Sequence, residues 1–238
     1  MCDYNEFSVL LDFNPKKIQM STTKYTDKLM KTAPQCGVVP GVPAVISQMV
    51  DGTLPADKFR NLVIQDIIID QHWKKFLAVL ISRIPSKFQT MGGHTPTEFL
   101  AAQILNHDKH KINDKFCHQL KIKRDEIQPT LVTKAVCDFL MSTVYNKTYK
   151  DALIILLASS RCIPEKMFTS PNPMYNEWLQ THVKSVNVIA SWAVSAINEI
   201  REEDDVNHKH QQLFNFATKY ENTFWESIDQ PQLYNWPC

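Results

Sequence analysis

The stretch VPAVISQMVDGTLPADKFRNLVIQD, residues 42–66, joins a short apolar segment to the start of a long amphipathic one. Between them, Asp51, Gly52 and Thr53 form a polar break that is typical of a turn. Pro55 suits the first turn of a helix, where its missing N–H costs little. From there apolar residues recur at helical spacing as far as about Pro85. The stretch therefore predicts a short helix, a turn and a long helix.

Helical periodicity recurs along almost the whole chain, whereas strand signals are weak. Thr95 and Glu98 have the spacing of a helix-capping pair. The segment KDALIILLASSRC, residues 150–162, is apolar on nearly all sides, which is typical of a central, buried helix. Further helices are expected to begin near Ser21, Pro129, Pro173 and Val206.

Short connections and the lack of any break in composition indicate one domain. We expect an all-α fold, a single compact bundle of seven to eight helices at residues 21–228. Residues 1–20 would form an N-terminal arm, and residues 229–238 a C-terminal tail.

The charge balance excludes some classes of partner. The 26 basic and 25 acidic side chains leave a formal charge of +1, which gives no electrostatic basis for binding nucleic acid or an anionic membrane. No apolar run approaches the roughly 20 residues that span a bilayer. Asp3 and Glu6 stand where a signal peptide would be basic, so we expect a cytoplasmic protein. The sequence leaves open a release from cells that needs no signal peptide.

The cysteines and histidines do not form a recognisable metal site. The six cysteines are scattered and none forms a Cys-x-x-Cys pair, so neither a disulfide framework nor a zinc site is indicated. The pairs His107/His110 and His208/His210 lie in highly polar stretches and are expected to face solvent. We therefore expect no metal and no cofactor.

Two carboxylates stand on helix faces that are otherwise apolar. Asp66 follows Leu62 and Val63 by four and three residues, and Glu221 precedes Phe224 and Trp225 by three and four. Burying a carboxylate costs free energy unless it is paired or hydrogen-bonded, and desolvation raises its pKa toward the range useful for proton transfer. The two side chains are thus either bridges between helices or the polar groups of a pocket.

Three segments resemble the TenA family, which includes thiaminase II, also called aminopyrimidine aminohydrolase, and has the haem-oxygenase-like helical fold. Residues 42–66 are similar to its opening, with a D-G-T-L-P turn followed by F…Q-D. MYNEWLQTHV, residues 174–183, is similar to its Y-x-x-W segment, and KYENTFW, residues 219–225, to its E-x-x-F-W terminal signature. The similarity covers roughly residues 20–228.

The resemblance implies a role for each of the two carboxylates on apolar faces. Asp66 would hydrogen-bond an aminopyrimidine ring, and Glu221 would act as general acid/base. Phe224 would line the ring pocket, and Tyr220, beside Glu221, would also contact the ligand. A carboxylate orients ring N–H groups well, and a desolvated glutamate transfers protons well.

The expected catalytic cysteine is missing from its place. Ser159 stands where the thiaminase II branch has this nucleophile, and a serine hydroxyl is far less nucleophilic than a thiolate. Cys162 follows one turn later and is a second candidate. Glu165 is a candidate for the acidic residue that another branch of the family is thought to use, or else it only ends a helix beside Pro164.

The pocket tyrosines of the family are replaced as well. Ile69, Val132, Ile163 and His182 occupy the expected positions, so an aromatic sandwich has become largely aliphatic. Each lost stacked pair removes about 0.5–1.5 kcal/mol of interaction.

The resemblance implies a protein that binds thiamin, an aminopyrimidine or a related small ring in a central pocket, with hydrolase activity weak or lost. One alternative is an active hydrolase that uses Glu221 as acid/base and Cys162 or water as nucleophile. Another is a non-catalytic interaction protein that reuses the bundle. Relatives are commonly homotetramers, so a homo-oligomer is expected.

Overall fold

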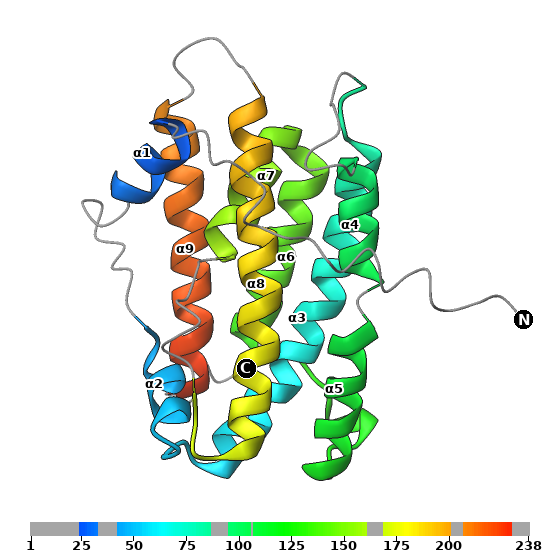
Figure 1. Ribbon diagram of the computed structural model, residues 1–238, viewed down its shortest axis with the longest axis vertical. Helices are drawn as coiled ribbons and strands as arrows, with labels where there is room; N and C mark the ends of the chain where they lie inside the picture. Colours follow the sequence, from blue (N-terminus) through cyan, green and yellow to red (C-terminus); the bar gives the residue numbers. More distant parts are fainter. Residues whose placement is uncertain are drawn as a thin grey trace, which may run out of the picture.

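The computed structural model describes residues 24–32, 42–86, 95–105, 107–160, 169–200 and 207–229. Within these ranges the chain forms nine α-helices and one short 3₁₀-helix, and no strand (Figure 1). The predicted all-α fold is confirmed. The count exceeds the expected seven to eight because the region after Thr95 contains two helices rather than one. The predicted N-terminal arm and C-terminal tail lie almost wholly outside the described residues.

The opening stretch folds as expected. Helix α2 (Ala44–Val50) is followed by a tight turn and by α3 (Ala56–Ser82), with Pro55 just before the first helical residue. Gly52 has φ 72° in this turn, and a Cβ there would lie 2.8 Å from Cγ of Pro171. Only glycine combines this backbone conformation with so close a neighbour.

Helices α4 (Pro96–Ile104) and α5 (His107–Gln119) cover one side of α3. The Thr95–Glu98 capping box is confirmed, because the side chain of each residue bonds the backbone N–H of the other. Helix α5 was not predicted because it is polar along most of its length. A 3₁₀ turn (Arg124–Glu126) follows it.

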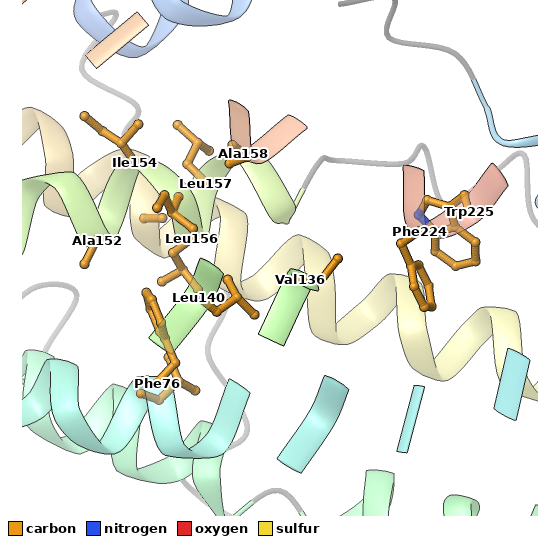
Figure 2. Close-up of a cluster of buried hydrophobic side chains, with 14 of the residues drawn as sticks. Phe76, Val136, Leu140, Ala152, Ile154, Leu156, Leu157, Ala158, Phe224 and Trp225 are labelled. Atoms are coloured by element: carbon orange, nitrogen blue, oxygen red, sulfur yellow. The ribbon is translucent and has the colours of Figure 1, made fainter. Parts of the chain in front are cut away.

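The remaining long helices run side by side in Figure 1: α6 (Leu131–Asn146), α7 (Tyr149–Ser159), α8 (Pro173–Glu199) and α9 (Asn207–Asp229). Helix α7 is central, as its apolar composition predicted, and every residue from Asp151 to Ala158 is buried. It packs against both α8 and α9. Figure 2 shows Leu140 of α6 between Phe76 of α3 and Leu156 of α7. The core thus extends continuously from α3 to α7.

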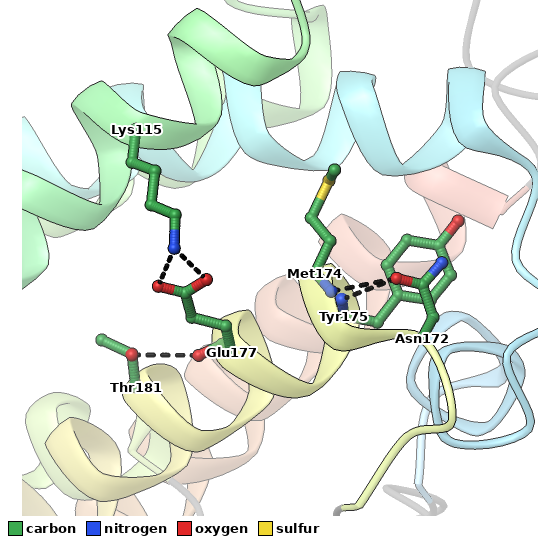
Figure 3. A network of polar contacts seen from close by, with 6 residues as sticks. All are labelled: Lys115, Asn172, Met174, Tyr175, Glu177 and Thr181. Carbon is green, nitrogen blue, oxygen red and sulfur yellow. Dashed lines mark hydrogen bonds and ion pairs between the residues drawn. The ribbon is translucent and has the colours of Figure 1, made fainter.

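Polar contacts anchor the start of α8 (Figure 3). Oδ1 of Asn172 accepts hydrogen bonds from the backbone N–H groups of Met174 and Tyr175, at 3.0 and 3.4 Å. Lys115 of α5 donates to both carboxylate oxygens of Glu177 at 2.6 and 2.7 Å. These bonds satisfy free N–H groups of the first turn and tie α5 to α8.

The short helix α1 (Lys24–Thr32) is joined to the bundle by a buried polar cluster. The Tyr25 hydroxyl is hydrogen-bonded to Nδ1 of His210, whose Nε2 lies 3.3 Å from Oδ1 of Asp151. Lys209 donates to Oδ2 of the same carboxylate at 2.9 Å. Burial acts to raise the pKa of Asp151, but hydrogen bonds from His210, Lys209 and Thr148 hold it below its ordinary value.

His210 corrects one expectation. Its side chain is only 2% exposed, although the surrounding sequence predicted a solvent-facing histidine. The reason is tertiary, because Tyr25 and Asp151 come from two other helices and cover the ring. The side chains of His107, His110 and His208 lie outside the described residues.

The two cysteines with described side chains are free and pack against the core: Cys137 is buried and Cys117 half-buried. Burial, with a smaller contribution from the nearby charge of Asp138, raises the pKa of the Cys137 thiol to about 11. Such a thiol stays protonated and unreactive at neutral pH. Among the described helices, none has the length and apolar character needed to cross a membrane.

Candidate functional site

A cavity of about 90 Å³ lies inside the bundle, between α3, α4, α7, α8 and α9. Helix α3 supplies one long wall with Asp66, Ile69, Asp70, Trp73, Lys74 and Leu77. The steps of three and four residues place these side chains on one face of the helix. At 1.5 Å per residue the stripe extends over about 16 Å. The cavity is therefore elongated along α3.

The cavity brings together the two carboxylates that stood on apolar faces. Asp66 is buried on α3, and Glu221 is half-buried on α9. Nε1 of Trp225 donates a hydrogen bond of 2.8 Å to Oε1 of Glu221. This bond satisfies part of the acceptor capacity of the carboxylate and orients it, so its partial burial costs less free energy.

Aromatic rings form the wall next to Glu221. Phe224 and Trp225 are in edge contact, with ring centroids 5.2 Å apart. His182 of α8 lies edge-on to Trp225, at 6.1 Å, and stacks on Trp178 at 4.6 Å with the planes 11° apart. His182 thus adds a planar ring to this wall, in a cavity whose aromatic lining can contact a flat ligand through ring edges and faces.

An ion pair on α3 was not anticipated from the sequence. Nζ of Lys74 lies 2.7 Å from Oδ2 of Asp70, and their side chains are 18% and 11% exposed. Both residues line the cavity, as does Gln103 of α4. The sequence signal was present but ordinary: an Asp and a Lys four residues apart, in register with Asp66.

Only some of the other predicted site residues line the cavity. Ser159, at the end of α7, and Ile69 line the cavity. Val132 packs against the core instead, and Tyr220 stacks on Phe139 with centroids 4.5 Å apart; neither is among the lining residues. Cys162, Ile163 and Glu165 lie outside the described residues.

The lining residues that the structure describes carry three carboxylates, one lysine and one histidine. This excess of acceptors suits a ligand with N–H donors, and Glu221 can exchange protons with it. No cysteine occurs among the described residues that line the cavity. In the same part of the chain no three His, Cys, Asp or Glu side chains are grouped so that they could hold a metal ion.

Residues 45–230 match the model of the TENA/THI-4/PQQC family. An aminopyrimidine aminohydrolase from Helicobacter pylori is 23% identical over 194 residues, which cover 75% of this chain and 86% of that protein. Two solved structures have a similar fold. A TenA homologue from P. horikoshii OT3 has a TM-score of 0.70 at 22% identity and covers 87% of this chain and 98% of its own. A TenA homologue from Pyrococcus furiosus has a TM-score of 0.65 at 16% identity, covering 86% and 100%.

Proposed function

The chain belongs to the TENA/THI-4/PQQC family, and on that premise we propose that its cavity binds an aminopyrimidine or a related small ring. One observation carries the proposal: Asp66 of α3 and Glu221 of α9 line the same cavity, beside Phe224. Asp66 accepts hydrogen bonds from the ring's amino group, Phe224 contacts the ring, and Glu221 exchanges protons with its nitrogens.

The size of the cavity favours one ring over two. Its volume of about 90 Å³ is below the roughly 150 Å³ of an apolar cavity that admits benzene. Even a single ring therefore requires small rotations of the lining side chains, and thiamin, with two rings, requires more. We place an aminopyrimidine before thiamin for this reason.

Hydrolysis is the second candidate function, and Glu221 favours it. In this reaction Glu221 takes a proton from a water molecule that attacks the carbon bearing the leaving amine, and returns a proton to that amine as its bond to the carbon breaks. Ser159 is the residue at the expected position of the nucleophile, and a serine hydroxyl is far less nucleophilic than a cysteine thiolate. We therefore propose that hydrolysis is weak or lost and that binding is the main property.

A third candidate is an interaction protein, and a homo-oligomer remains part of the proposal. Tyr145 of α6 and Phe216 of α9 are 63% and 58% exposed, which is unusual for aromatic side chains. Light scattering of the purified protein distinguishes a monomer from a tetramer.

A cytoplasmic location is likewise a proposal, and fractionation of cells tests it.

Titration calorimetry with an aminopyrimidine and with thiamin tests ring binding. We expect the aminopyrimidine to bind and Asp66→Asn to weaken it about tenfold or more, since a hydrogen bond to a charged group contributes roughly 1.5–3 kcal/mol. Asp57→Asn, on an exposed part of the same helix, is the matched control and should leave affinity unchanged. A wild-type protein that binds neither compound would overturn the proposal and favour the interaction protein.

A further inference from the structure

Three rings surround the indole of Trp225, whose N–H donates the hydrogen bond to Glu221. Phe224 lies beside it on α9, with the ring centroids 5.2 Å apart (Figure 2). The centroids of Trp178 and His182, both on α8, lie 6.2 and 6.1 Å away, and their planes are 85° and 88° from that of the indole. The indole thus contacts aromatic rings from two helices.

The two rings on α8 form a stacked pair. Trp178 and His182 are four residues apart, so their side chains share one face of the helix. Their centroids are 4.6 Å apart and their planes differ by 11°. Trp178 is only 3% exposed and belongs to the core, whereas His182 lines the cavity. Trp178 therefore fixes the plane of His182 from within the core.

The cavity gives the indole of Trp225 room to move. The indole borders the cavity, as do His182 and Glu221, so packed side chains do not enclose it on every side. Rotation about the bond that joins an aromatic ring to its side chain is soft. A hydrogen bond weakens steeply as its angle at the hydrogen narrows. The bond to Glu221 therefore depends on what keeps the indole from turning.

The contacts with α8 supply this restraint. Aromatic rings favour perpendicular contacts with centroids about 4.5–7 Å apart, and both contacts of Trp225 with the stacked pair have this geometry. Turning the indole would give up both at once. Packing alone does not require a flat side chain at position 182, because Val186 and Ile189 of the same helix line the cavity as aliphatic residues.

We propose that Trp178 and His182 are positioning residues for Glu221 and act on it through Trp225. The stacked pair fixes the plane of the indole, and the indole N–H then holds the carboxylate. The consequence for a ligand rests on the proposed function, in which Glu221 exchanges protons with the bound ring. The inference adds that residues of another helix determine how the carboxylate is oriented.

The first experiment follows the indole N–H of Trp225 by nitrogen-15 NMR of the full chain without a ligand. The chain has five tryptophans, and the indole signal that disappears in Trp225→Phe identifies this one. His182→Asn removes the ring but keeps hydrogen-bonding groups, and it should speed hydrogen exchange of this N–H at least about tenfold. His182→Phe keeps a flat ring and should stay within about threefold of the wild type.

Two further variants complete this experiment. Phe216→Asn removes an exposed ring from α9 and is the control, which should leave the exchange of the Trp225 N–H unchanged. Trp178→Phe replaces the stacked indole by a smaller ring, and it should speed the exchange about two- to fivefold. It decides the question where His182→Asn does not fold.

Calorimetry with an aminopyrimidine connects the ring contacts to the ligand. His182→Asn should weaken binding about three- to tenfold, and His182→Phe should weaken it less. His182 also lines the cavity, so His182→Asn is repeated in a protein that carries Glu221→Gln. There its effect on affinity should shrink to within about twofold, because the two residues act through one interaction.

The outcomes separate this proposal from that of ring binding. Unchanged exchange of the Trp225 N–H in His182→Asn would overturn the positioning role, with or without a ligand. Equal acceleration in His182→Asn and His182→Phe would also overturn it, because the ring of His182 would then not be what holds the indole. A full effect of His182→Asn on affinity in the Glu221→Gln protein would exclude the route through Glu221. If the exchange responds as expected but the wild type binds no aminopyrimidine, the positioning stands and ring binding is wrong.

Discussion

The indole N–H of Trp225 donates a hydrogen bond to Oε1 of Glu221 over 2.8 Å, so an aromatic residue of the cavity wall holds the acidic group next to it. The two residues are one turn apart on α9, where such pairs face each other. Because Trp225 is buried, its N–H needs this partner as much as the carboxylate needs the donor.

Trp225→Phe should therefore impair both stability and ligand binding. The variant loses the hydrogen bond but keeps an aromatic ring, and we expect the free energy of unfolding to fall by about 1–3 kcal/mol. Affinity for an aminopyrimidine should also fall, because Glu221 loses its orientation. Denaturant unfolding and calorimetry measure the two effects. Glu221→Gln keeps an acceptor for the indole, so its stability should stay close to that of the wild type; equal losses in both variants would contradict this role of the bond.

Ser159→Cys should increase hydrolysis if the cavity retains the rest of the machinery. A thiol is intrinsically far more nucleophilic than a hydroxyl, so we expect release of ammonia from an aminopyrimidine to rise at least about tenfold. Ser159→Ala is the control that removes the hydroxyl alone. Adding Glu221→Gln to the cysteine variant should abolish the gain, because a general acid/base contributes about 10²–10⁴-fold. No increase in the cysteine variant would mean that more than the nucleophile has been lost.

Asp151→Asn should destabilise the fold through the polar cluster that holds α1. The carboxylate is fully buried, with Lys209 at 2.9 Å and His210 at 3.3 Å. Breaking such an arrangement leaves a buried histidine without its anionic neighbour, and the expected loss is about 3–5 kcal/mol. Thermal and urea unfolding measure it. Asp138→Asn, on an exposed position of α6, should change stability by less than about 0.5 kcal/mol.

The lowered pKa of Asp151 also makes the free energy of unfolding depend on pH. The pKa of Asp151 is lowered in the folded protein, whereas an aspartate in the unfolded chain titrates near 3.9. As the pH falls below about 4, the unfolded state binds a proton that the folded state still excludes, so the free energy of unfolding falls with it. Urea titrations between neutral pH and about pH 3 should show this decline in the wild type. Asp151→Asn should show a shallower one, and parallel curves would contradict the assignment.

Gly52→Ala should weaken the turn between α2 and α3. Alanine meets two costs there, a φ of 72° and a Cβ only 2.8 Å from Cγ of Pro171. We expect a loss of about 1–3 kcal/mol in the free energy of unfolding. Combining the change with Pro171→Ala removes the close contact but not the backbone strain, so the double variant should recover part of the loss. Full additivity of the two single effects would show that the contact does not matter.

Much of the secondary structure follows from local rules. Apolar spacing predicts α3, α7 and α9, and the Thr95–Glu98 pair and Pro173 predict where α4 and α8 begin, because caps and proline act within one helical turn. Helix α5 was not predicted because little of it faces the core. Among its residues with described side chains, only Asn113 and Phe116 are buried. Its sequence therefore has too few apolar residues to show the spacing of three and four that indicates a helix.

The sequence by itself determined that Asp66 and Glu221 occupy apolar faces, because residues three and four positions away decide which face of a helix is buried. It also determined the family, through short segments that stay in order along the chain. The resemblance implied that these two carboxylates share a pocket, and the tertiary structure has both of them lining one cavity. Only the tertiary structure decided that Asp70 and Lys74 line it too, and that His210 is covered by Tyr25 and Asp151. The reason is physical: these relationships join helices that are far apart in the chain, and no local period or spacing encodes which distant helix packs against which.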